Sequence, residues 1–143
     1  MLNEKSCGAV VYVSNPEIKY LLLQYEAGHW DFVKGNVEEG ESDRETALRE
    51  LKEETGIADA RFLGGFREKI SYFYKRQGAT VYKEVVFFLM EAKNMNVKLS
   101  FEHVAFDWLT YEQAMKKLTF KNARDVLQRA RESLQKQGMG KGP

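Results

Sequence analysis

The sequence contains only one cysteine, Cys7, among its 143 residues. A single cysteine excludes an internal disulfide framework and leaves no cysteine-rich metal site. The N-terminal segment also lacks the apolar stretch of a signal peptide. We therefore expect a cytoplasmic protein that folds without disulfides.

Long hydrophobic runs and an excess of one charge are also missing. The two most apolar stretches, at 20–25 and 85–90, end after six residues, whereas a membrane-spanning helix needs about 20. Lysine and arginine total 22 against 21 aspartates and glutamates. We therefore expect no membrane contact and no obligate nucleic-acid partner. No feature of the sequence indicates a protein partner.

Length predicts a single domain over residues 1–137, followed by a disordered tail at 138–143. Apolar, β-branched stretches at 6–13 and 19–25 predict one hairpin, and the aromatic-rich runs 61–75 and 81–93 predict a second. A short strand should follow at 103–109. Two helices should then begin near Thr110 and Asn122, the second with one apolar stripe.

The segment Gly35–Ile57 is unusually acidic, with seven glutamates and three basic residues. Ser42 and Glu45 have the spacing of a capping box, and Gly56 stands where a helix commonly ends. This punctuation predicts a helix over Asp43–Thr55.

Three carboxylates should project side by side from that helix, because Glu50, Glu53 and Glu54 share one face at about 100° per residue. The like-charge pair Glu50 and Glu54 costs roughly 0.2–0.5 kcal/mol, and Arg49 alone cannot neutralise the cluster. A bound cation would offset the repulsion, and oxygen ligands suit Mg²⁺, with Mn²⁺ as the alternative. The apolar residues expected to anchor the helix to the core are Ala47, Leu48 and Leu51.

The same segment reads Gly35, five residues, Glu41, seven residues, then Arg49-Glu50-Leu51-x-Glu53-Glu54-x-Gly56-Ile57. In this spacing it resembles, at every fixed position, the signature of the Nudix hydrolases. This resemblance implies an α/β/α sandwich with a central mixed sheet, in which the signature forms a loop–helix–loop unit. It also implies an enzyme that hydrolyses a nucleoside diphosphate linked to another moiety, using a divalent metal and attack of water on phosphorus.

The resemblance assigns roles to matching residues. The metal ligands would be the carbonyl of Gly35 and the side chains of Glu50, Glu53 and Glu54, with Glu102 in a later loop as a further ligand. Glu50 is our first choice for the general base, and Glu102 is the second. Arg49 and Glu41 would brace the loop against the helix. The residues expected to act in catalysis are Glu50, Glu54, Glu102 and Arg49.

Outside the signature, residues 7–127 also resemble the asymmetrically cleaving dinucleoside tetraphosphate hydrolases. In that group a histidine and two lysines approach phosphates, and an aromatic residue stacks on a base. The matching positions, with one aromatic neighbour on the same strand face, are His29, Lys34, Lys83, Tyr72 and Tyr74. The resemblance implies Mg²⁺-assisted cleavage of a dinucleoside tetraphosphate into a nucleoside triphosphate and a nucleoside monophosphate. Lys83 has a structural alternative, as a charge on an edge strand.

Two other functions stay open. A Nudix pyrophosphohydrolase acting on RNA 5′ triphosphate ends, nucleoside triphosphates or nucleotide sugars would keep the same signature, and a non-catalytic nucleotide-binding module would keep the fold. Basic residues on the last helix are a possible RNA contact, although we expect a solvated face.

Two positions depart from the usual pattern of these relatives. Val33 stands where they usually have proline, which predicts a less restrained loop. No aromatic residue follows Phe120, which predicts loose base specificity.

Overall fold

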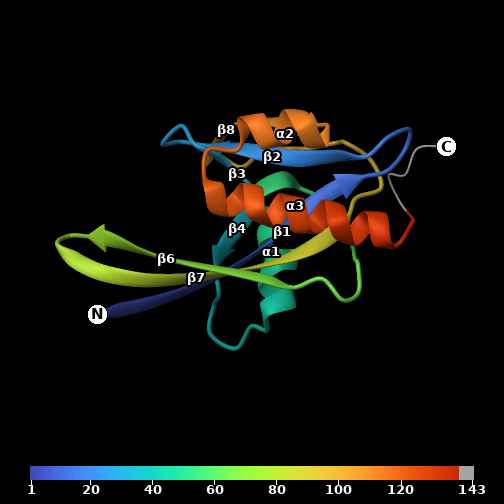
Figure 1. Cartoon of the computed structure of the whole chain (residues 1–143). Helices are drawn as coiled ribbons and strands as arrows, with labels where there is room; N and C mark the ends of the chain where they lie inside the picture. The colour runs from blue at the N-terminus through green and yellow to red at the C-terminus, as the bar shows by residue number, and fades with distance from the viewer. Residues whose placement is uncertain (139–143) are drawn as a thin grey trace.

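A mixed β-sheet forms the centre of the computed structural model, which describes residues 1–138 (Figure 1). The strands of this sheet within that range are β1 (Leu2–Val13), β2 (Lys19–Tyr25), β3 (Trp30–Asp31), β4 (Val33–Asn36), β5 (Arg61–Phe62), β6 (Glu68–Arg76), β7 (Ala79–Glu91) and β8 (His103–Leu109). Their order is β3-β2-β1-β7-β5, while β4 pairs with β1, β6 with β7 and β8 with β2.

The longest pairing joins β1 and β7 in parallel, from Leu2 opposite Val81 to Tyr12 opposite Glu91. The predicted first hairpin is present, but β1 and β2 pair only at their adjoining ends. Residues 6–13 of β1 are buried throughout, as expected for a strand covered on both faces. The main partner of β1 is therefore a strand about 80 residues away, which the local pattern did not predict.

Helices cover both faces of the sheet. On one face, Leu51 and Ile57, in and just after α1 (Asp43–Thr55), pack with apolar residues of β1 and β2. On the other face, α2 (Tyr111–Lys117) and α3 (Lys121–Lys136) pack over Tyr20, Phe87 and their neighbours. The predicted α/β/α sandwich with a central mixed sheet is confirmed. Of the predicted tail, residues 139–143 lie outside the described residues.

Helix α1 begins and ends as predicted. Ser42 Oγ accepts from the N–H of Glu45, the Glu45 carboxylate accepts from the N–H of Ser42, and Gly56 closes the helix with φ 76°. The prediction that Leu48 anchors α1 is wrong, because its side chain is 40% exposed. The buried face of α1 instead includes the carboxyl-bearing Glu54.

Strands β6 and β7 form the predicted second hairpin, and Figure 1 shows it projecting to one side of the sandwich. Gln77 and Gly78 make its two-residue turn with positive φ values of 50° and 80°, as a type I′ turn requires. Lys83 of β7 lies between Glu4 of β1 and Tyr72 of β6. The alternative interpretation of Lys83 as an edge-strand charge is therefore wrong. No helix of residues 1–138 has the length and hydropathy to cross a membrane.

Strand β4, which contains Gly35 at the start of the acidic segment, pairs closely with β1. Lys34 lies opposite Gly8, and Gly35 lies opposite Cys7. A Cβ atom on Gly8 would overlap the carbonyl oxygen of Val33, so only glycine permits this approach. Val33 is itself buried and paired with β1, so strand pairing holds this segment although it lacks proline.

We predict that Gly8→Ala destabilises the protein by about 3–5 kcal/mol, because the new methyl group meets main-chain atoms that cannot move aside. Urea unfolding followed by circular dichroism measures the difference. Gly64→Ala is the matched control, since a Cβ there meets no atom within 4 Å and its backbone does not adopt a positive φ. Equal stability of the two variants would contradict the close approach.

Candidate active site

Arg49 of α1 stands at the centre of the charged residues in the acidic segment. Its Nε and Nη2 donate to the two carboxylate oxygens of Glu41, at 2.6 and 3.0 Å. Nη2 also donates to the carbonyl of Asn36, while Nη1 donates to Glu50 at 2.8 Å and Glu53 at 3.2 Å. The hydrogen bonds from Arg49 hold the pKa of Glu41 at about 2. Arg49 and Glu41 therefore join the loop to the helix, at the positions that the sequence analysis gave them.

Glu50 and Glu54 lie next to one another on the inner side of α1. Glu54 is only 4% exposed, and burial, with the neighbouring Glu50, raises its pKa well above the usual range. The main-chain N–H of Lys34 lies close enough to the Glu54 carboxyl group to offset part of this rise in pKa, but Glu54 Oε1 has no hydrogen-bond partner. A Cβ atom on Gly35 would overlap the Glu50 carboxylate. These contacts bring Gly35, Glu50 and Glu54 together as the metal-site prediction requires.

The two remaining predicted metal ligands lie at the rim. The Glu53 side chain is 57% exposed and points toward Arg49, and Glu102 is exposed in the turn before β8. Glu102 is still near, since its charge contributes to the raised pKa of Glu54. Within residues 1–138, no three acidic, histidine or cysteine side chains converge into a preformed metal centre. The five-ligand set therefore stays a prediction.

His103 is a buried neighbour of Glu54 that sequence reasoning did not single out. Its side chain is fully enclosed, with Nδ1 3.2 Å from Ser100 Oγ and Nε2 3.7 Å from Glu54 Oε1. Burial lowers its pKa. The imidazole packs edge-on against Tyr25, with ring centroids 4.5 Å apart. Its place directly after Glu102 was the signal available in the sequence.

A cavity of about 560 Å³ opens beside these carboxylates, between the β6–β7 hairpin and the start of α3. Its wall includes every residue predicted to bind substrate, namely His29, Lys34, Tyr72, Tyr74 and Lys83. It also includes residues that sequence reasoning did not assign to substrate, namely Asp31, Ile70, Phe120, Lys121, Asn122 and Ala123. Residues from four separate segments of the chain thus enclose one space.

Two lysines give this cavity a positive interior. Lys34 Nζ lies 3.1 Å from Asp31 Oδ2; burial alone would lower the pKa of Lys34, but the charge of Asp31 outweighs it and the pKa is raised. Burial and the positive charge of Lys34 lower the pKa of Lys83. Because both lysines line the cavity, it suits a ligand that carries several negative charges.

Aromatic rings line two sides of the cavity. Tyr72 and Tyr74 lie on one face of β6 with centroids 6.3 Å apart. Phe120, the N-cap residue of α3, is half exposed and lies 5.4 Å from the ring of His29, which stacks on Tyr25. Helix α3 itself contains no aromatic residue, as expected from the sequence. Its N-cap residue, Phe120, nevertheless places an aromatic ring in the cavity wall.

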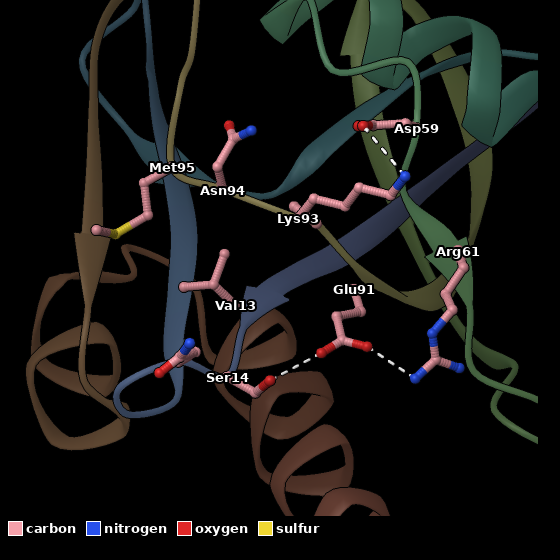
Figure 2. A pocket seen from close by; sticks show the side chains of 10 residues that line it. Val13, Ser14, Asp59, Arg61, Glu91, Lys93, Asn94 and Met95 are labelled. Carbon is pink, nitrogen blue, oxygen red and sulfur yellow. Dashed lines mark hydrogen bonds and ion pairs between the residues drawn. The ribbon is translucent and has the colours of Figure 1, made fainter.

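Figure 2 shows a second cavity, of about 550 Å³, near the ends of β1 and β7. Its charged groups pair with one another: Arg61 with Glu91 at 2.7 Å and Lys93 with Asp59 at 3.8 Å, while Ser14 donates to Glu91. None of the predicted site residues lines it. The unpaired buried carboxyl oxygen and the partly buried Lys34 and Lys83 lie in the other region, which we take as the candidate active site.

Comparison with known proteins agrees with this geometry. The NUDIX domain model matches residues 5–130. The asymmetrical bis(5′-nucleosyl)-tetraphosphatases of Mus musculus and Sus scrofa are each 37% identical, over 91% of this chain and 95% of theirs. The crystal structure of a C. elegans Ap4A hydrolase binary complex superposes with a TM-score of 0.82 at 30% identity, covering 93% of this chain and 98% of that one. The chain therefore belongs to the Nudix family, as its acidic segment indicated.

Proposed function

We propose that this protein hydrolyses dinucleoside tetraphosphates asymmetrically, releasing a nucleoside triphosphate and a nucleoside monophosphate. Lys34 carries the proposal, because its side chain lines the aromatic cavity while its main-chain N–H lies close enough to the Glu54 carboxyl group to act on its pKa. A polyphosphate bound by that lysine would therefore lie next to the carboxylate cluster. The similar mouse, pig and C. elegans proteins, which are named for this substrate class, support the choice.

A divalent cation fits the carboxylate cluster, and Nudix hydrolases use such ions. Glu54 Oε1 is buried without a hydrogen-bond partner, which suits a position that a cation would satisfy. The ligands would be the Gly35 carbonyl with Glu50, Glu53 and Glu54, and Glu102 from the rim. All of these donors are oxygens, so we favour Mg²⁺, with Mn²⁺ as the alternative. When bound, the ion would screen phosphate charge and lower the pKa of the attacking water.

The chain's own side chains supply the remaining functions. Lys34 and Lys83 would neutralise the phosphate chain from the cavity side. His29 lies beside them in the wall and can donate to a phosphate, while Tyr72, Tyr74 and Phe120 are placed to stack on a base.

The carboxylate cluster would then prepare the attacking water. Glu50 is the proposed general base, because its carboxylate contacts the Gly35 backbone and is oriented by Arg49. Glu102 stays the second choice.

The RNA-end alternative has less support. Basic side chains of α3 contact the protein itself: Arg129 pairs with Glu68, Arg124 donates to the carbonyl of Leu118, and Arg131 lies over the ring of Tyr111. Arg129 and Lys136 are exposed, as the predicted solvated face requires, while Arg124 and Arg131 are partly buried. The complete signature and the clustered Glu50 and Glu54 favour an enzyme over a non-catalytic binding module. A cytoplasmic location stays a prediction.

Incubation with diadenosine tetraphosphate and Mg²⁺ in ¹⁸O-labelled water should give ATP and AMP in equal amounts, because water attacks one phosphorus near an end of the chain. Chromatography with mass spectrometry identifies the products and shows which one carries the label. Formation of two ADP molecules would contradict asymmetric cleavage. Turnover of nucleoside triphosphates alone would point to another Nudix substrate.

Replacing either carboxylate of the cluster should reduce turnover without unfolding the protein. We expect Glu54→Gln and Glu50→Gln each to lower kcat by roughly 10²–10⁴-fold. Burial already favours a neutral group at position 54, so an amide of the same shape should keep the fold, as thermal unfolding can verify. Exposed Glu132 of α3 provides the control variant, Glu132→Gln. Wild-type turnover in both cluster variants at saturating Mg²⁺ would reject the assignment.

Phe120→Ala should raise the KM for diadenosine tetraphosphate by roughly 5- to 150-fold with little change in kcat, since one base-stacking contact contributes about 1–3 kcal/mol. Phe73→Ala is the matched control, because Phe73 is an exposed aromatic on the opposite face of β6 from Tyr72. Steady-state kinetics with diadenosine tetraphosphate gives the KM and kcat of both variants. If the two variants have the same KM, Phe120 does not contact the base.

A further inference from the structure

Two buried polar atoms face one another without a partner beside the catalytic helix. Among the described residues, Glu54 Oε1 and His103 Nε2 are the buried side-chain atoms that lack a hydrogen bond, and they lie 3.7 Å apart. This separation is too long for a hydrogen bond. Buried polar groups in native proteins are nearly always paired. Two such atoms at this distance therefore point to a bond that forms in another state of the site.

The neighbouring loop accommodates a proton on Nε2 of His103. The N–H of Glu102 donates to Ser100 Oγ, at 3.4 Å, and the Ser100 hydroxyl lies 3.2 Å from His103 Nδ1. The Ser100 proton is free to point at Nδ1, which then accepts. In this arrangement the imidazole proton is on Nε2, the atom that faces Glu54.

The imidazole is held in place, so Glu54 is the group that has to adjust. His103 begins β8, its side chain is fully enclosed, and its ring rests against Tyr25. The N–H of Ser100 also donates to the main-chain carbonyl of Glu54, at 3.2 Å, which ties this loop to α1. A movement of the Glu54 carboxylate by about 1 Å brings it within hydrogen-bond distance of Nε2.

We propose that His103 is a positioning residue that donates its Nε2–H to Glu54 when the carboxylate cluster holds a cation. This inference rests on the metal site of the proposed function. The hydrogen bond orients the Glu54 carboxyl group and leaves its other lone pairs for the ion. Outer hydrogen bonds of this kind fix the direction of a ligating carboxylate and strengthen metal binding. Ser100 contributes indirectly, because its hydroxyl can donate to Nδ1 in this tautomer of His103.

The test measures Mn²⁺ binding by the full-length, metal-free protein without substrate, using the electron paramagnetic resonance signal of free Mn²⁺. His103→Leu should weaken binding by about 10- to 100-fold, because it removes the donor. His103→Gln should restore most of the affinity, because its amide nitrogen can reach the position of Nε2. Glu132→Gln, the exposed α3 variant, is the control and should bind Mn²⁺ as the wild type does.

Each outcome decides the proposal. If His103→Leu binds Mn²⁺ as tightly as the wild type, His103 does not position Glu54, while the proposed function still stands. If the Leu and Gln variants are equally weak, His103 acts only through packing and the proposal fails. A wild-type protein without Mn²⁺ affinity would overturn both the metal site and this inference. Ser100→Ala, expected to weaken binding less than His103→Leu, keeps the test valid if the leucine variant does not fold.

Discussion

The charge of Arg49 holds the acidic segment together. Seven glutamates within 23 residues would repel one another, yet one guanidinium group reaches Glu41 in the loop and both Glu50 and Glu53 on the helix. Arginine suits this position because its five N–H donors lie in one plane and remain charged. The same group also bonds the carbonyl of Asn36, next to the Gly35 main chain. Arg49 therefore joins the loop to the helix and fixes Glu41, Glu50 and Glu53 relative to one another.

The acidic helix was predictable because the residues that define it are close in sequence. Ser42, Glu45 and Gly56 act on main-chain groups within one helical turn, so spacing alone sets its ends. The exposure of Leu48 was not predictable in this way. Which side of a helix meets the sheet depends on β1 and β4, and here that side includes the polar Glu54.

Sequence reasoning identified cavity residues individually but could not show that they form one wall. Tyr72 and Lys83 lie opposite one another in the predicted β6–β7 hairpin, but their place beside His29 depends on the parallel pairing of β1 with β7, which no local pattern signals. In the sequence, Phe120 was only the last aromatic residue before a helix, whereas in the structure its ring packs near that of His29, about 90 residues earlier. His103 was hidden for the same reason, because its partner Glu54 lies about 50 residues earlier. The sequence pattern therefore identified individual site residues, but not the contacts between residues that are far apart in the chain.

The side chain and the main chain of Lys34 face different parts of the site. Its ammonium group lines the cavity and is lost with most substitutions, whereas the peptide N–H near Glu54 is carried by every residue except proline. Under the proposed function, a substitution at this position would therefore change the preference for one anionic ligand over another while leaving the main chain beside Glu54 unchanged.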